Sequence, residues 1–225
     1  MPTAATPDRR GEAAGETPVR QRILSAAFAA FMEAGYAETS TLEIARRARV
    51  SKRELYAVVG NKHEMLVACI RERAKRLQAP ADLPEPRDRD TLERALTTFG
   101  TQLLRETTNP TVIAVFRLAI AEAVRAPEVA HALHSFGHQT SRAALTAIMT
   151  QAQSRGLLTG RPPQMAEQFA GLLWGDLMIS LLLRIAETPA PREINRRARN
   201  AATAFLQLHP ETGQKSADLS GLDVL

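Results

Sequence analysis

The sequence lacks features that secreted proteins and many enzymes depend on. Aromatic residues make up only 4% of its 225 residues, and Cys69 is its single cysteine, so no disulfide can form within the chain. We expect Cys69 to be a packed thiol in an apolar helix, with a redox-sensing thiol as the alternative. Glycine-rich phosphate loops, Gly-x-Ser-x-Gly and His-Glu-x-x-His are all absent. These absences argue against a disulfide-stabilised protein and against the common hydrolases.

Long apolar runs are also scarce. The first 16 residues are rich in proline, glycine, alanine and charge, and they hold no apolar run that could serve as a signal peptide. Residues 169–186 are about as long as a membrane span, but Asp176 and Arg184 would be costly in lipid. We therefore expect a disordered N-terminal tail, a buried interface helix at 169–186 instead of a membrane helix, and a cytoplasmic protein.

Strand signals are missing as well. Alternating β-branched or aromatic runs do not occur, whereas apolar residues recur every three or four positions, which predicts an all-α protein. A first helix should begin at Pro18, with Thr17 as its cap, and end at Gly35. We expect further helices at 41–48, 52–58, 62–78, 91–107, 110–125, 127–155, 163–186 and 191–207, with a proline-rich connector at 79–90.

Charge is distributed unevenly between the two parts of the chain. Residues 18–78 contain 12 Lys/Arg and 6 Asp/Glu, whereas residues 79–225 contain 15 of each. A basic unit beside a neutral, apolar body indicates nucleic-acid binding at one end and a different task at the other.

Residues 41–60, TLEIARRARVSKRELYAVVG, have the spacing of two helices that cross. Ala45 is small where the second helix must approach, and Ser51 can cap that helix with Glu54 three residues later. The apolar contacts between the two helices would come from Ile44, Ala48, Val50, Leu55 and Val58. The segment predicts a helix-turn-helix.

The outward side chains of the second helix suit DNA. Lys52, Arg53 and Tyr56 are of the types that bond bases and phosphates in the major groove, and Arg46, Arg47 and Arg49 lie nearby. A solvated basic face on a helical core is the alternative.

Residues 20–66 resemble the N-terminal domain of the tetracycline-repressor (TetR/AcrR) family of transcriptional regulators. The shared features, in order and in register, are the Ile23–Phe31 run, Gly35-Tyr36, Thr39-Ser40, Ile44-Ala45, Ala48, Val50-Ser51, Leu55-Tyr56 and Lys62. The resemblance covers about residues 17–77. It implies that Ser40 and Thr41 open the first helix of the motif against phosphate, that Ser51, Lys52, Arg53 and Tyr56 face the groove, and that Lys62 holds the DNA backbone.

The sequence departs from the family pattern at several positions. Arg49 stands where glycine is usual, so it would need a positive φ at a cost on the order of 1 kcal/mol, and it would add a phosphate contact. Val59 stands where an aromatic residue is usual. Arg53 and Glu54 replace a common Gly-Thr, so the base preference should not follow that of better-known members.

The resemblance also assigns roles to the helical body. It implies that helices 163–186 and 191–207 form a dimer interface with their counterparts, and that helices within 91–155 enclose an effector pocket. The first of these helices has almost no polar face, which independently favours an interface through Phe169, Leu173, Leu177, Leu181 and Ile185. For the pocket we predict aromatic and flexible apolar side chains on inward faces, with plain core packing as the alternative: Phe99, Leu103, Phe116, Ile120, Phe136, Trp174 and Met178.

Three histidines, His131, His134 and His138, share one helix and suggest a metal site. The outer two would lie about 10.5 Å apart along the helix axis, too far for one ion to bind both. We therefore expect surface or pocket histidines, no metal and no cofactor.

Together these features predict four parts: a tail at 1–16, a DNA-binding domain at 17–77, an effector-binding and dimerisation domain at 78–209, and a flexible tail at 210–225. The predicted function is a repressor, not an enzyme, that binds a pseudo-palindromic DNA operator as a homodimer and is released by a small apolar or aromatic effector. The alternatives are a helical enzyme with a vestigial basic domain and a non-specific architectural DNA-binding protein.

Overall fold

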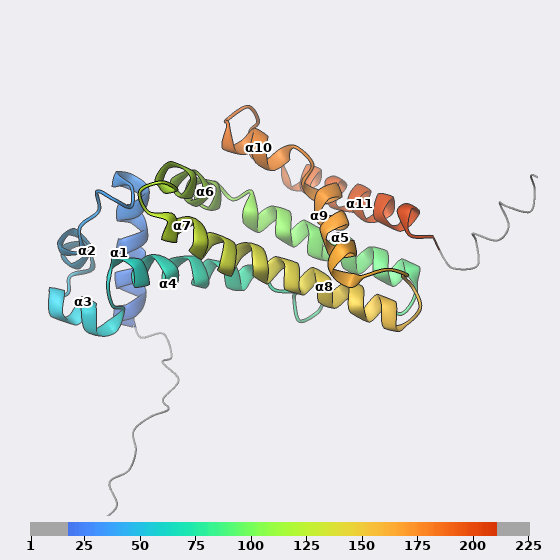
Figure 1. The fold of residues 1–225 in the computed structure, drawn as a ribbon, viewed down its shortest axis with the longest axis horizontal. Coiled ribbons are helices and arrows are strands. Elements are labelled where there is room, and N and C mark those ends of the chain that lie inside the picture. Colours follow the sequence, from blue (N-terminus) through green and yellow to red (C-terminus); the bar gives the residue numbers. More distant parts are fainter. Residues whose placement is uncertain (1–17, 211–225) are drawn as a thin grey trace, which may run out of the picture. The chain divides into compact units, whose positions relative to one another are not determined.

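The computed structural model describes residues 18–210. Thr17 and the expected tails, apart from Pro210, lie outside the described residues. Helices make up the regular structure of the described part, which contains no strand, so the all-α prediction is confirmed (Figure 1). The chain divides into two compact units, and the division falls between Cys69 and Ile70, within α4 (Lys62–Ala74).

The first unit contains α1 (Pro18–Ala34), α2 (Thr41–Ala48), α3 (Lys52–Val58) and the beginning of α4. The predicted bounds of α2 and α3 are confirmed to the residue, and α1 ends as expected at Gly35, whose φ is 87°. The start of α4 is also as predicted, because Asn61 and Glu64 form a reciprocal capping box. The core of this unit is formed by fully buried apolar side chains, among them Ile23, Phe31, Ile44, Leu55 and Met65.

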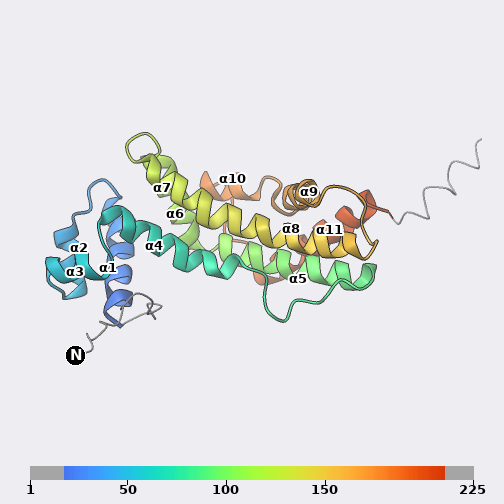
Figure 2. The same ribbon diagram turned by 60° about the horizontal axis from the view of Figure 1, so that its bottom comes forward.

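The second unit begins with the end of α4 and a short 3-10 helix, η1 (Lys75–Leu77). Its further helices are α5 (Arg89–Thr107), α6 (Pro110–Glu122), α7 (Pro127–Ala132), η2 (Leu133–His138), α8 (Gln139–Ser154), α9 (Pro162–Trp174), α10 (Leu177–Leu182) and α11 (Pro191–Leu208). Helix α5 packs against α11, α8 against α9, and α9 against α11 (Figure 2). Their shared core includes Leu96, Phe99, Met149, Phe169 and Phe205.

The helix predicted at 127–155 has the expected extent but not a uniform geometry. Helices α7, η2 and α8 follow one another without interruption, and the six residues of η2 form a π-helix. A π-helix places one more residue in the turn than an α-helix does. The outward-facing His134 and His138 lie in this segment, and their rings stack with centroids 5.2 Å apart.

The single helix predicted at 163–186 is wrong. Helix α9 starts one residue earlier, at Pro162, and ends at Trp174; α10 begins only at Leu177. Between them Gly175 has φ 46° and ψ −124°, a conformation that side chains with a Cβ rarely adopt. The chain therefore bends at Gly175. No helix among residues 18–210 is both long enough and apolar enough to cross a membrane.

Arginine side chains close the C-terminal ends of three helices in the second unit. Arg197 donates to the carbonyls of Leu173 (2.8 Å) and Trp174 (2.6 Å) at the end of α9. Arg117 bonds the last carbonyls of α10 in the same way, and Arg89 those at the end of α11. A cation at this end is favourable because the last carbonyls of a helix have no partner within it and carry partial negative charge.

Candidate nucleic-acid interface

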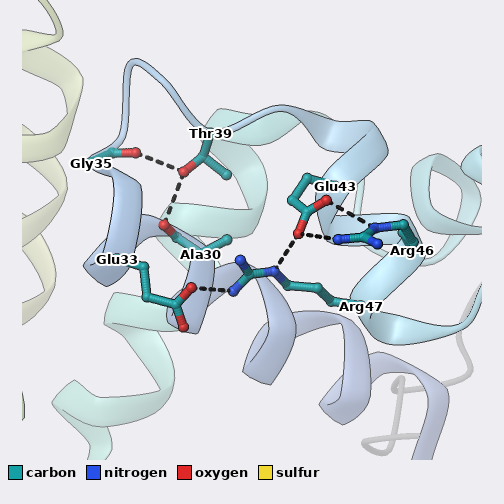
Figure 3. Close-up of polar contacts among 7 residues, drawn as sticks. All are labelled: Ala30, Glu33, Gly35, Thr39, Glu43, Arg46 and Arg47. Atoms are coloured by element: carbon teal, nitrogen blue, oxygen red, sulfur yellow. Dashed lines mark hydrogen bonds and ion pairs between the residues drawn. The ribbon is translucent and has the colours of Figure 1, made fainter.

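The pair α2 and α3 is held by apolar contacts and by a buried hydroxyl. Ile44, Ala45 and Leu55 are buried where the two helices pack. Thr39, also buried, donates from its hydroxyl towards the carbonyls of Ala30 (3.1 Å) and Gly35 (2.7 Å), which ties the loop before α2 to the end of α1 (Figure 3). The loop that leads into the motif is thereby fixed.

Two serines predicted to contact DNA cap the two helices of the motif. The Ser40 hydroxyl accepts a hydrogen bond from the backbone N–H of Glu43 (3.1 Å), and the Ser51 hydroxyl accepts one from Glu54 (3.0 Å). A hydroxyl that accepts one bond can still donate its own hydrogen. Capping is therefore compatible with the predicted phosphate contacts.

Arg49 terminates α2 in the left-handed conformation, with φ 55° and ψ 46°. The positive φ expected from the missing glycine is confirmed. Its backbone N–H bonds the Arg46 carbonyl (3.2 Å), so the backbone closes the helix while the side chain stays exposed in the turn before α3.

The outward face of α3 carries the residues predicted to enter the groove. Lys52, Arg53 and Tyr56 are exposed, Tyr56 by 44%, whereas Leu55 between them is fully buried. The Tyr56 hydroxyl lies 3.3 Å from the Thr41 hydroxyl of α2, and the Lys52 ammonium lies 5.9 Å from the centre of the Tyr56 ring. The structure thus brings Thr41, Lys52 and Tyr56 together.

Glu43 organises the two arginines of α2. Arg46 bonds both carboxylate oxygens of Glu43, each at 3.0 Å, and Arg47 bonds Glu43 and Glu33, each at 2.7 Å (Figure 3). These bonds lower the pKa of Glu43 to about 2, and the bonds from Arg46 have the largest effect. The Glu43 carboxylate is therefore ionised at neutral pH. Sequence reasoning counted both arginines as a basic surface and missed the two glutamates, although the spacing of Glu43 to Arg46 and Arg47 on one helix was a usable signal.

Lys62 is bound to its own chain. Its ammonium donates to the carbonyls of Tyr36 (2.9 Å) and Ala37 (3.1 Å) and lies 4.6 Å from the centre of the Tyr36 ring. This arrangement joins the start of α4 to the turn after α1. Since an ammonium group has three N–H donors, a contact to the DNA backbone stays a prediction.

Two family models match this chain. The model of bacterial regulatory proteins of the tetR family matches residues 23–69, and the model of the AefR-like transcriptional repressor C-terminal domain matches residues 94–209, more than half of the chain. The chain belongs to the TetR family of transcriptional regulators. The resemblance stated from the sequence is thereby confirmed. Among curated proteins, none matches the chain.

Solved structures of TetR-family regulators share the fold. A TetR transcriptional regulator from Agrobacterium tumefaciens has a TM-score of 0.74 at 25% identity, and the match covers 89% of this chain and 99% of that one. The flavonoid-responsive regulator FrrA has a TM-score of 0.72 at 26% identity, with 85% and 97% covered. A TetR-family regulator from Pseudomonas syringae pv. tomato has a TM-score of 0.63 at 25% identity, with 86% and 97% covered.

The effector residues predicted for this TetR-family protein lie in three environments. Phe99 and Leu103 are buried in the core, whereas Phe116, Phe136, Trp174 and Met178 are half-buried. Ile120 is 62% exposed, so the prediction that it faces inward is wrong. Helix α6 is apolar on nearly every side, and periodicity could not identify its inner face.

Surface cavities lie in the part of the second unit that the structure describes, and none of the seven predicted effector residues lines the following two. One, of about 330 Å³, lies between α9 and α11 beside Leu172 and Arg197. The other, of about 680 Å³, follows α8 from Gln139 to Ser154 and reaches Pro163.

The residues predicted for the dimer interface are mostly buried within one chain. Phe169, Leu173, Leu177 and Leu181 belong to the core of the second unit and are already covered within one chain, whereas Ile185 is 75% exposed. Helices α9 and α10 carry apolar residues on both faces, and the predicted residues other than Ile185 lie on the buried face. The exposed apolar residues here are Leu172, Ile179, Leu183 and Ile185.

The three histidines are exposed at the surface of α7 and η2. Partial burial of the His138 ring is the largest cause that lowers its pKa below the usual value, and repulsion from His134 and Arg142 lowers the pKa further. The carboxylate of Glu167 opposes this shift. Within residues 18–210, no cluster of three or more His, Cys, Asp or Glu side chains could hold a metal ion.

Proposed function

We propose that this TetR-family regulator is a repressor that binds a pseudo-palindromic operator as a homodimer and leaves it when a small apolar or aromatic effector binds. The observation that carries the DNA-binding part is the face of α3, where Lys52, Arg53 and Tyr56 are exposed on a helix fixed by buried Leu55 and by the Ser51 cap. In a dimer, two such helices about 34–36 Å apart reach successive major grooves on one side of the DNA.

Dimerisation is supported by the apolar residues that a single chain leaves exposed on α9, on α10 and just after it. Ile179, Leu183 and Ile185 are 53%, 61% and 75% exposed. Covering these side chains with the same face of a second copy would remove apolar surface from water on both chains, as a two-fold symmetric interface does.

An effector is supported by the second unit. Its family model is that of AefR-like repressors, and FrrA, a structural relative, is named as flavonoid-responsive. Half-buried aromatic side chains such as Phe116 and Trp174 suit an apolar or aromatic ligand. The Arg71 guanidinium of α4 lies 4.6 Å from the centre of the Phe136 ring in η2. Because α4 spans the boundary of the two units, this contact gives an effector a route to the DNA-binding unit.

The direction of the response follows from linkage. If the effector binds better to a dimer whose two α3 helices cannot reach both half-sites, it weakens operator binding by the same factor by which the operator weakens effector binding.

An anisotropy titration tests the proposal. The full chain is titrated with DNA that flanks its own gene, at about 150 mM salt and with excess random competitor, because weak non-specific binding does not survive these conditions. Binding that is retained against the competitor, with an affinity that rises as the salt concentration falls, supports a sequence-specific regulator. Binding that is lost to competitor on every flanking fragment would contradict it and favour an architectural DNA-binding protein.

The dimer part has its own test. Ile185→Glu places a charge in the exposed apolar face and should shift the protein from dimer to monomer in sedimentation. Val124→Glu is the matched control, because Val124 is 95% exposed but lies beyond α6, outside that face. Wild-type protein that sediments as a monomer at micromolar concentration would refute this part.

A further inference from the structure

Arg53 differs in its contacts from Arg46, Arg47 and Lys62, the cations near the motif that bind groups of their own chain. Its side chain is exposed on α3, and within residues 18–210 it makes no hydrogen bond or ion pair. Arg46 and Arg47 are held by Glu43 and Glu33, and Lys62 is held by carbonyls of its own chain. Arg53 therefore keeps all its guanidinium donors available for a ligand.

The position of Arg53 on α3 also points it towards that ligand. Successive residues of a helix are about 100° apart, so Arg53 lies about 160° around the axis from Leu55, which is fully buried. Lys52 and Tyr56 lie only about 60° and 100° from Leu55 on the same count. Arg53 is thus the polar side chain that points most directly away from the core.

The surroundings of Arg53 permit close approach. Ala57, four residues later, lies on the same outer line of the helix, and its small side chain leaves room beside the guanidinium. Arg53 also lies in the first turn of α3, and residues early in a recognition helix are those that contact base edges.

We propose that Arg53 reads one guanine in each half of the operator. The guanidinium has a planar fork of donors that matches the O6 and N7 acceptors of guanine in the major groove, whereas phosphate contacts carry no sequence information. The inference rests on the function proposed above and assigns a specificity to the same site.

Selection of binding sites from random duplex DNA tests this assignment. The full chain should enrich a symmetric site with guanine at one fixed position in each half. Arg53→Ala should lose the enrichment of that guanine, because alanine has no donor for O6 or N7, and Arg53→Lys should keep it only in part, because lysine keeps the charge but not the fork. Arg46→Ala is the matched control, an exposed arginine already bound to Glu43, and should keep the same guanine.

Titrations of the selected site complete the test. Replacing the guanine with adenine should weaken binding of the wild-type protein about tenfold to hundredfold per half-site and should leave binding of Arg53→Ala nearly unchanged. Circular dichroism checks that the variants fold. If the wild type enriches no common sequence, the proposed function fails. If it enriches a symmetric site and Arg53→Ala still distinguishes guanine from adenine as the wild type does, Arg53 does not read that base.

Discussion

Replacing Arg49 with glycine should stabilise the protein while weakening its hold on DNA. Arg49 has φ 55° and ψ 46°. A residue with a side chain costs about 1–2 kcal/mol in this left-handed conformation. Glycine avoids that cost but loses about 0.5–1 kcal/mol more backbone entropy on folding. The difference between the middles of these two ranges predicts a free energy of unfolding that is higher by about 0.5–1 kcal/mol for Arg49→Gly.

The effect on DNA should have the opposite sign. Arg49 is exposed in the turn before α3, so the substitution removes one cation per subunit from the proposed interface. If that cation neutralises a phosphate, the slope of log affinity against log salt becomes shallower by about 1 for each subunit. Thermal unfolding should show a melting temperature higher by about 1–4 °C, and anisotropy at several salt concentrations gives the slope.

Two variants separate the backbone effect from the charge effect. Arg184, just after α10, is exposed and has φ 59°, so Arg184→Gly should stabilise the protein by a similar amount without changing the salt slope. Arg49→Lys keeps both the positive charge and the backbone cost and should leave both measurements close to wild type. The reasoning about φ is refuted if Arg184→Gly stabilises the protein and Arg49→Gly destabilises it. An unchanged salt slope for Arg49→Gly would show that Arg49 contacts no phosphate.

Three further substitutions probe other contacts. Glu43→Gln removes the ion pair of Arg46, while Arg47 keeps its ion pair with Glu33, so random-sequence DNA should bind more tightly, with a salt slope steeper by about 1 per subunit in titrations. An unchanged slope would show that Arg46 lies away from DNA. Gly100→Val should lower the free energy of unfolding, measured in urea, by about 1–3 kcal/mol, because a Cβ at Gly100 would lie only 3.2 Å from the Leu173 Cδ1. The control is Gly171→Ala, which should not destabilise the protein because a Cβ there meets nothing within 4 Å. Equal losses of stability in the two variants would contradict the packing argument. The pKa of His138 is lowered on folding, so the unfolded chain binds more protons, and the free energy of unfolding falls as the pH drops through about 6.5. His138→Gln should make this fall smaller in urea titrations at several pH values. An unaltered pH profile would assign the dependence to other groups.

The helix-turn-helix could be predicted in detail because its signals are local. Ser40 and Ser51 cap helices that begin at the next residue, and the inward residues of α2 and α3 recur with helical spacing. The backbone conformation of Arg49 was expected from the resemblance and not from a local signal, because the family usually has glycine at that position. By contrast, the bond between Arg47 and Glu33 joins residues 14 positions apart, and no local pattern indicates it.

The second unit was harder to predict because it is apolar on many sides. Helices α9 and α10 carry leucine or isoleucine on both the buried and the exposed face, so periodicity could identify neither the inner face nor the bend. Gly175, followed by Asp176, was the available signal for the bend. The part that Gly175 plays in the bend depends on Arg197 of α11, whose guanidinium bonds the carbonyls at the end of α9.

The π-helix in the middle of the second unit gives this chain a site at which its length can change. A π-turn is equivalent to a single residue inserted into an α-helix, and η2 accommodates that residue while Val129 before it and Leu145 after it both face the core. Deleting one residue within η2 would restore regular α-helical spacing and leave both flanks in register. The same deletion inside α8 would turn everything on one side of it by about 100° and carry buried side chains to the surface. A deletion of one residue from this helix should therefore disturb the core least at 133–138 and more along the rest of the helix.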